Sequence, residues 1–405
     1  MCIGMHRGKP SCGVCSGLRR AQTLTLFVGL HHMEITMREK LILAALSIVL
    51  LSSPKTAAAQ CSTFGGRATV VQANGLGILP VALADTGNIN STGGTNQASL
   101  LNVSVPGLLL GDVLHATAIG GGSASQSEAS IANVNLTVAG NTISAGFVMS
   151  RANAFCGSAR TINGITEVDG LVVNGQSVGV TGFANQTVSL PGGAWIIINE
   201  QTGSSSSGSI QVNALHVTVP GVADVVTASS SAAVSVQFIG ASGGPHLFVG
   251  MLLQVTGNTF HGPGCDFVTG GGWINADPDT NGPIIKGTFA VAGGISSNFD
   301  GWGHLEYQDH GTGMKVHGTG VTSYGPAPLP PLSSNPNAKE IKGTANVDGQ
   351  SGYSYTVDVA DNGEPGIGTD FFQITIYPTG NPIAVIYAAA GTLQGGNIQL
   401  HNRCF

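Results

Sequence analysis

The sequence has 405 residues, of which 9% are charged, 42% are hydrophobic and 61 are glycine; this balance excludes a disordered chain and supplies enough apolar material for a sizeable core. From Gln60 onward there are eight basic and nineteen acidic residues, a formal net charge of −11. Binding to nucleic acid or to an anionic membrane surface needs clustered lysine and arginine, so neither is expected as a partner.

The first predicted element is an export signal at residues 37–59. It has a charged start at 37–40, an apolar run at 41–51 and three alanines at 57–59, which is the pattern of a secretory signal peptide. The apolar run is too short for a transmembrane helix, and a buried core helix is the alternative. We therefore expect cleavage before Gln60 and a mature chain that has no transmembrane segment and lies outside the cell or at its surface.

Residues 1–36 precede this signal and carry no structural pattern. They are expected to be a leader that results from a mis-assigned start, or an extended amino-terminal part of the signal. In either case they contribute nothing to the fold.

The region 60–240 shows short β-rich runs separated by glycine, asparagine and serine. Some alternate as half-buried strands do, with Val134, Leu136 and Val138 on one face. Asn174-Gly175 is the preferred dipeptide of a tight hairpin. Strands without intervening helices predict a β-sandwich. The expected strands lie at 68–72, 99–105, 133–138, 142–149, 171–173, 177–181, 186–190, 194–199, 209–219 and 234–238.

A glycine-rich linker is expected at 241–264, and a second β domain at 265–405. The whole mature chain is therefore predicted to be all-β, with two antiparallel domains of sandwich or barrel type and little helix apart from the signal peptide. The strands expected in the second domain lie at 266–274, 284–292, 301–307, 314–321, 340–347, 353–359, 371–377, 383–388 and 396–401.

The mature chain keeps four cysteines, Cys61, Cys156, Cys265 and Cys404. Four cysteines in an exported protein allow three disulfide connectivities. Their positions favour Cys61–Cys156 and Cys265–Cys404, because each bridge then lies within one domain.

Two stretches resemble known bacterial modules. The first domain resembles the choice-of-anchor P family through the strings ASLLNVSVPG (98–107), SEAS (127–130), NTIS (141–144), GLVVNG (170–175), IINEQT (197–202) and NALHVTVPGVAD (213–224). The second is similar to the post-COAP-1 domain through DFVTGGGWI (266–274), DHGTGMKVH (309–317) and DVADNGEPG (358–366). The resemblance implies a surface or secreted protein with no assigned biochemical activity. Because the sequence ends in HNRCF (401–405) without a sorting motif, free secretion is expected rather than anchoring.

Two acidic turns in the second domain are candidate calcium sites. Asp277, Asp279 and Asn281 follow the D-x-D-x-N-G start of a calcium loop, although Thr288 stands where the loop's bidentate glutamate is expected. In the second turn the candidate ligands are Asp361, Glu364 and Asp370. A solvated tight turn is the alternative in both places, since the same residue types favour turns.

Two clusters of polar residues could support metal binding or catalysis. His304, Glu306 and His317 fall on neighbouring predicted strands and could hold a transition metal. Glu200, Asn213 and His216 could support acid–base chemistry. Neither cluster comes with a recognised catalytic motif, so structural hydrogen bonding is the favoured interpretation and no enzymatic activity is expected.

Trp273 and Trp302 are candidate ligand-binding residues, because aromatic rings on exposed strands stack on sugars; core packing is the alternative. Two functions follow. The favoured one is a non-catalytic structural or adhesive protein, stabilised by calcium if the acidic turns bind it. The alternative is an extracellular carbohydrate-binding or carbohydrate-active protein. Cell-envelope glycans and other surface proteins are the expected partners.

Overall fold

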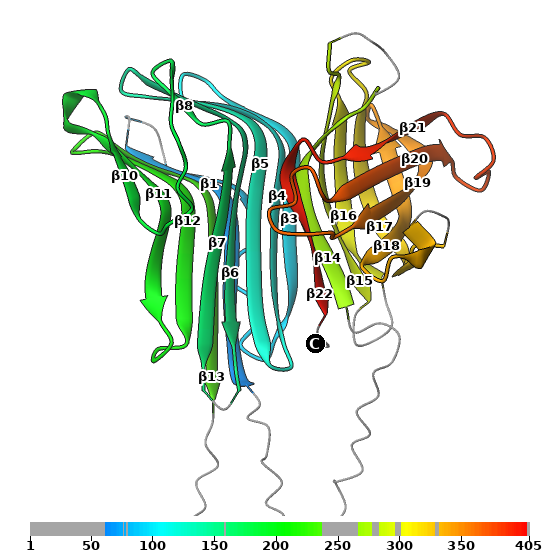
Figure 1. Ribbon diagram of the computed structural model, residues 1–405, viewed down its shortest axis with the longest axis horizontal. Helices are drawn as coiled ribbons and strands as arrows, with labels where there is room; N and C mark the ends of the chain where they lie inside the picture. Colours follow the sequence, from blue (N-terminus) through cyan, green and yellow to red (C-terminus); the bar gives the residue numbers. More distant parts are fainter. Residues whose placement is uncertain are drawn as a thin grey trace, which may run out of the picture. The chain divides into compact units, whose positions relative to one another are not determined.

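The computed structural model describes residues 61–236 and 266–402, apart from 76, 78–79, 158, 278–282, 296–300 and 329–331. In this part of the chain nearly all regular structure is antiparallel strand, with two single 3₁₀ turns, which confirms the all-β prediction (Figure 1). The expected leader, signal peptide and linker lie outside the described residues. No helix in the described ranges is both long and apolar enough to cross a membrane.

The first sheet has six strands and joins the beginning of the region 61–236 to its end. Its strand order is β10-β11-β12-β13-β1-β2. The bounds are β1 (Cys61–Gly75), β2 (Val81–Asp85), β10 (Gln186–Ser189), β11 (Trp195–Ser204), β12 (Ser209–Val219) and β13 (Ala223–Val236), with the 3₁₀ turn η1 (Pro191–Gly193) between β10 and β11.

The second sheet has seven strands and comes from the middle of the same region. Its order is β3-β4-β5-β6-β8-β9, and β7 also pairs with β6. The bounds are β3 (Gly94–Val105), β4 (Leu109–Gly121), β5 (Ala124–Val138), β6 (Asn141–Phe155), β7 (Thr161–Asp169), β8 (Val172–Val173) and β9 (Gln176–Ser177).

These two sheets share one apolar core, to which Val70 and Leu215 contribute from the first sheet and Leu114 and Leu136 from the second. In β5, Val134, Leu136 and Val138 are buried and alternate with more exposed residues, as predicted. Successive side chains of a strand point to opposite faces, so one face of β5 lies against the core.

The predicted Asn-Gly hairpin is also present. Asn174 and Gly175 connect β8 to β9, and both have positive φ, 50° and 77°. These values match the type I′ turn that the twist of a two-residue hairpin requires.

The third sheet contains nine strands, all from residues 266–402, and curls around its own core (Figure 1). Its order is β21-β20-β19-β18-β17-β16-β15-β14-β22. The bounds are β14 (Asp266–Asn275), β15 (Lys286–Ile295), β16 (Gly301–Asp309), β17 (Lys315–Pro326), β18 (Ala338–Val347), β19 (Gln350–Ala360), β20 (Phe371–Pro378), β21 (Tyr387–Thr392) and β22 (Gly395–Asn402), with the 3₁₀ turn η2 (Leu332–Ser334) before β18.

Aromatic side chains fill the concave side of this sheet. The rings of Phe289 and Phe372 stack with centroids 3.8 Å apart, and the Tyr307 ring lies parallel to that of Phe372 at 6.1 Å. At one end of the β14–β22 pair, Gln394 N, in the turn between β21 and β22, donates to Trp273 O across 2.9 Å. The first and last strands of the region, β14 and β22, are hydrogen-bonded neighbours.

Candidate functional site

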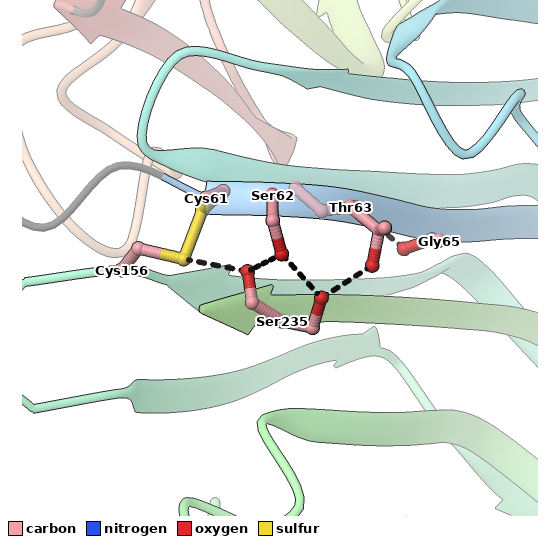
Figure 2. Close-up of a disulfide and its surroundings, with 7 residues drawn as sticks. Cys61, Ser62, Thr63, Gly65, Cys156 and Ser235 are labelled. Atoms are coloured by element: carbon pink, nitrogen blue, oxygen red, sulfur yellow. Dashed lines mark hydrogen bonds between the residues drawn. A yellow bond between two sulfur atoms is a disulfide. The ribbon is translucent and has the colours of Figure 1, made fainter. Parts of the chain in front are cut away.

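A disulfide ties the first sheet to the second. Cys61 at the start of β1 is bonded to Cys156, which directly follows β6, with their Cα atoms 5.5 Å apart. Figure 2 shows Ser235 beside the bridge, where its hydroxyl lies 2.9 Å from Ser62 Oγ and 2.6 Å from Thr63 Oγ1. The prediction for this pair is thus confirmed. Cys265 and Cys404 lie outside the described residues, so their pairing stays a prediction.

The most buried ionic contact in the described chain joins Arg151 of β6 to Glu128 of β5. The two residues are direct partners across the strands, and Arg151 Nη2 lies 2.8 Å from Glu128 Oε2, with side chains 1% and 3% exposed. Arg151 Nε donates to the same oxygen at 2.8 Å. Burying two charges in this way is costly unless each is well paired.

Residues of the third sheet complete this contact. The Thr269 hydroxyl of β14 donates to Glu128 Oε2 across 2.9 Å, and it lies 2.9 Å from His401 Nε2 of β22. A hydroxyl has one proton to give, so His401 Nε2 donates to Thr269. The cavity beside Glu128 measures about 10 Å³, room for no more than a single water. The contact therefore holds the second and third sheets together, and the cavity beside it is too small for a substrate.

The three predicted ligands of the second acidic turn are occupied by groups of the chain itself. Asp370 is fully buried; its Oδ1 accepts from Asn362 N at 2.8 Å and its Oδ2 from Ile398 N at 2.8 Å. Asp361 Oδ2 accepts from Leu400 N, also at 2.8 Å. These bonds fix the turn against β22. Burial raises the pKa of Asp370 to about 6, although the backbone amides oppose the rise.

Glu364, the third residue of that set, points toward the buried arginine. Its Oε1 accepts from Asn397 Nδ2 at 3.1 Å and lies 3.7 Å from Arg151 Nη1. Glu167 of β7 belongs to the same charged group: burial raises its pKa to about 7, the charges of Glu364 and Asp169 add to the rise, and Arg151 opposes it. One cation thus lies near carboxyl groups from β5, from β7 and from the segment between β19 and β20.

The first acidic turn is only partly described. Asn275 Oδ1 accepts from Asp277 N at 3.3 Å and from Ile285 N at 3.2 Å, which holds the two ends of the turn together. Asp279 and Asn281 lie outside the described residues. Within the described part of the chain, no group of three histidine, cysteine, aspartate or glutamate side chains is arranged to hold a metal ion.

Glu306 and His317 do meet, as the sequence suggested. The fully buried Glu306 accepts from His317 Nδ1 and from Ser99 Oγ of β3, each at 2.7 Å, and burial raises its pKa. The His304 ring has a different partner, because its Nδ1 lies 3.1 Å from Gln97 Oε1. Burial lowers the pKa of His304 well below its usual value, and the neighbouring His115 and His317 lower it further. Like Glu128, this cluster joins the second sheet to the third.

Glu200, Asn213 and His216 also come together, on β11 and β12 of the first sheet. Glu200 Oε2 lies 2.6 Å from Asn213 Nδ2 and 2.8 Å from His216 Nδ1. His216 Nε2 lies 2.7 Å from Asp224 Oδ1. Burial lowers the pKa of His216, but the bonds to Asp224 and Glu200 outweigh it and the pKa is raised. A ring that donates from both nitrogens has no lone pair to accept a proton.

The two predicted tryptophans lie in different surroundings. Lys286 Nζ lies 4.6 Å from the centre of the Trp273 ring and so covers one face of it. Trp302, at the start of β16, is half-buried and lines a cleft of about 510 Å³. The structure therefore separates two residues that the sequence grouped.

The ion pair Arg151–Glu128 was not among the sequence-based candidates, although a signal for it exists. Arg151 is one of only three basic residues between Lys55 and Lys286. Counting outward from the turn at Ala139–Gly140 places it opposite Glu128. Two opposite charges at paired positions of strands rich in small residues predict a cross-strand pair.

Comparisons with known proteins add little. No family model and no curated protein matches the chain. Among solved structures, a crystal structure of "a putative AttH" from Nitrosomonas europaea is similar at 9% identity, with a TM-score of 0.16, over 84% of this chain and 93% of that chain. At this score the likeness carries no information on function.

Proposed function

We propose that the chain is an exported structural or adhesive protein that works without catalysis. The observation that carries the proposal is the disulfide Cys61–Cys156. Structural disulfides form and persist outside the reducing cytoplasm, and this one agrees with the signal peptide expected at 37–59. Residues 60–405 would be the exported form, and Cys265–Cys404 its second bridge.

The polar contacts support a structural role. Glu128, Glu306 and Asp370 are buried, and each accepts hydrogen bonds from partners within the chain, through one carboxylate oxygen in Glu128 and Glu306 and through both in Asp370. Catalytic acids and bases need access to a substrate, whereas these groups hold strands together. A rigid module with internally paired charges suits a protein that bears load or presents a surface.

The resemblance to the choice-of-anchor P family and the post-COAP-1 domain supports the same proposal. Proteins of that kind are secreted or displayed on bacterial cells. Envelope glycans and other surface proteins are accordingly the proposed partners.

Calcium at Asp277, Asp279 and Asn281 is the proposed stabilising ion, because alternating oxygen ligands suit a hard cation. Calcium is expected to raise the melting temperature of the wild type and to leave the Asp277→Asn/Asp279→Asn double variant unchanged. Magnesium serves as the control ion. Equal melting temperatures of the wild type with calcium and with a chelator would remove calcium from the proposal.

Export is tested by expressing the full chain in a bacterial host and separating cytoplasm, envelope and medium. The wild type is expected in the envelope or the medium at the size of residues 60–405. Leu46→Arg, which places a charge in the apolar run of the signal, is the matched control and is expected to stay in the cytoplasm uncleaved. Wild-type protein that also stays there uncleaved would overturn the proposal.

A further inference from the structure

The cleft that Trp302 lines lies where the first residues of β1, β3 and β16 meet the last residues of β4 and β15. Its volume of about 510 Å³ falls in the range of about 300–1,000 Å³ found for small-molecule sites. By contrast, the cavity at the buried ion pair holds about 10 Å³. The cleft, unlike this cavity, has room for a ligand of several rings.

Two aromatic rings line this cleft, Trp302 and Phe64 of β1. The Trp302 ring is held in place from behind, because the Phe267 ring lies 5.5 Å from it at an angle of 52° and Phe267 in turn stacks on His401 at 4.3 Å. A Cβ atom at Gly294, the partner of Trp302 on β15, would lie 2.8 Å from the indole carbons. Glycine there lets the indole lie against the strand.

The rest of the lining carries no charge. Thr92 and Thr95 contribute hydroxyl groups, Gly120–Gly122 contribute bare backbone, and Ile295 is the other apolar side chain. A charged ligand would lose its hydration here without gaining a partner of opposite sign. A ligand with both apolar faces and many hydroxyl groups fits all of these walls.

A second cleft, of about 420 Å³, provides a comparison within the same molecule. It lies over the first sheet and is lined by residues such as Asn88, Thr202, Gln211 and Ser231, with no aromatic ring among its lining residues. It offers hydrogen bonds but no surface on which a sugar ring can stack. The aromatic pair therefore distinguishes the first cleft.

We propose that the cleft between Phe64 and Trp302 binds a neutral oligosaccharide, with a sugar ring stacked on the Trp302 indole. The C–H face of a pyranose packs on an aromatic ring, whose face is electron-rich, while the threonine hydroxyls and the glycine backbone bond to the sugar hydroxyls. Trp273, with one face covered by Lys286, takes no part.

The experiment is isothermal titration of residues 60–405 with the hexamers of four neutral glycans: cellulose, chitin, xylan and amylose. A hexamer of galacturonic acid is the charged control. At least one neutral hexamer is expected to bind to the wild type, and the charged one is not. Trp302→Ala is expected to weaken binding at least tenfold, and Trp273→Ala and Trp195→Ala to leave it unchanged.

A second variant guards against a folding defect in Trp302→Ala. Thr95 is exposed at the cleft wall, so Thr95→Arg should fill the cleft without disturbing the core, and it is expected to abolish binding. Gln211→Arg, which makes the same change in the second cleft, should bind as the wild type does. The proposal is overturned if no neutral hexamer binds, or if Thr95→Arg binds unchanged. Export and disulfide formation are read out separately, so this failure would leave the proposed function standing.

Discussion

Glu128 and Arg151 face each other across β5 and β6, and the oxygen of Glu128 that receives the arginine also receives the hydroxyl of Thr269 from the third sheet. The pair therefore stabilises two things together, the β5–β6 hairpin and the contact with β14. Its effect on stability can be measured.

Arg151→Ala is expected to lower the free energy of unfolding by about 3–5 kcal/mol, because it leaves Glu128 buried without its cation. Replacing both residues, as in Arg151→Met with Glu128→Leu, is expected to cost much less, since no unpaired charge remains. Urea unfolding measures both. Arg67→Ala, which removes the exposed pair with Asp85, is the control and should cost less than about 1 kcal/mol. An Arg151→Ala loss as small as that of Arg67→Ala would contradict the structural role.

Glu167→Gln is expected to stabilise the protein at neutral pH. Burial raises the pKa of Glu167 to about 7 from the ordinary value of 4.5, so between these values the folded state binds more protons and stability falls as pH rises. Each unit of difference between the folded and unfolded pKa corresponds to about 1.4 kcal/mol. The advantage of the variant over the wild type should be near zero below pH 4.5, grow from there to pH 7, and stay constant above. Parallel stability curves for the two proteins would refute this.

Replacing both Cys61 and Cys156 by serine is expected to destabilise the protein by about 4 kcal/mol, since the bridge closes a loop with a sequence separation of 95 residues. Thermal or urea unfolding under non-reducing conditions measures the loss. Ser62→Ala, a change beside the bridge, is the control and is expected to have a small effect. If a reducing agent does not lower the stability of the wild type toward that of the double variant, the bridge does not stabilise the protein as predicted.

His216 is expected to remain charged to a higher pH than an ordinary histidine. Burial disfavours the charged ring, but Asp224 and Glu200 favour it more and raise the pKa. The stability that these bonds provide is fully present below pH 6.5 and is lost as pH rises through the raised pKa. An NMR titration of the ring measures the value, and Asp224→Asn is expected to lower it. A midpoint at or below 6.5 in the wild type would show that burial prevails.

The all-β class and several strands could be predicted from the sequence because their signals are local. Alternation in β5 and the Asn174-Gly175 turn depend only on neighbours in the chain. Strand β4 was missed altogether. Its residues include Asp112, His115 and several glycines, which read as a loop, yet much of the strand is buried because sheets cover it on both sides.

The candidate sites were less predictable, since the sequence names residue types but not their partners. The sequence offers Asp361 and Asp370 as candidate cation ligands, but it does not show that the amides of Leu400 and Ile398 bond to them. Trp273 and Trp302 look equivalent until Lys286 is found over one of them. These partners lie far away in the chain and follow from the tertiary fold alone.

The most direct test of export is mass spectrometry of the protein recovered from the outside of the cell, digested without reduction. We predict a chain that begins at Gln60 and a peptide pair linked through Cys61 and Cys156. Recovery of Cys61 and Cys156 as free thiols, in a chain that still carries residues 37–59, would contradict it.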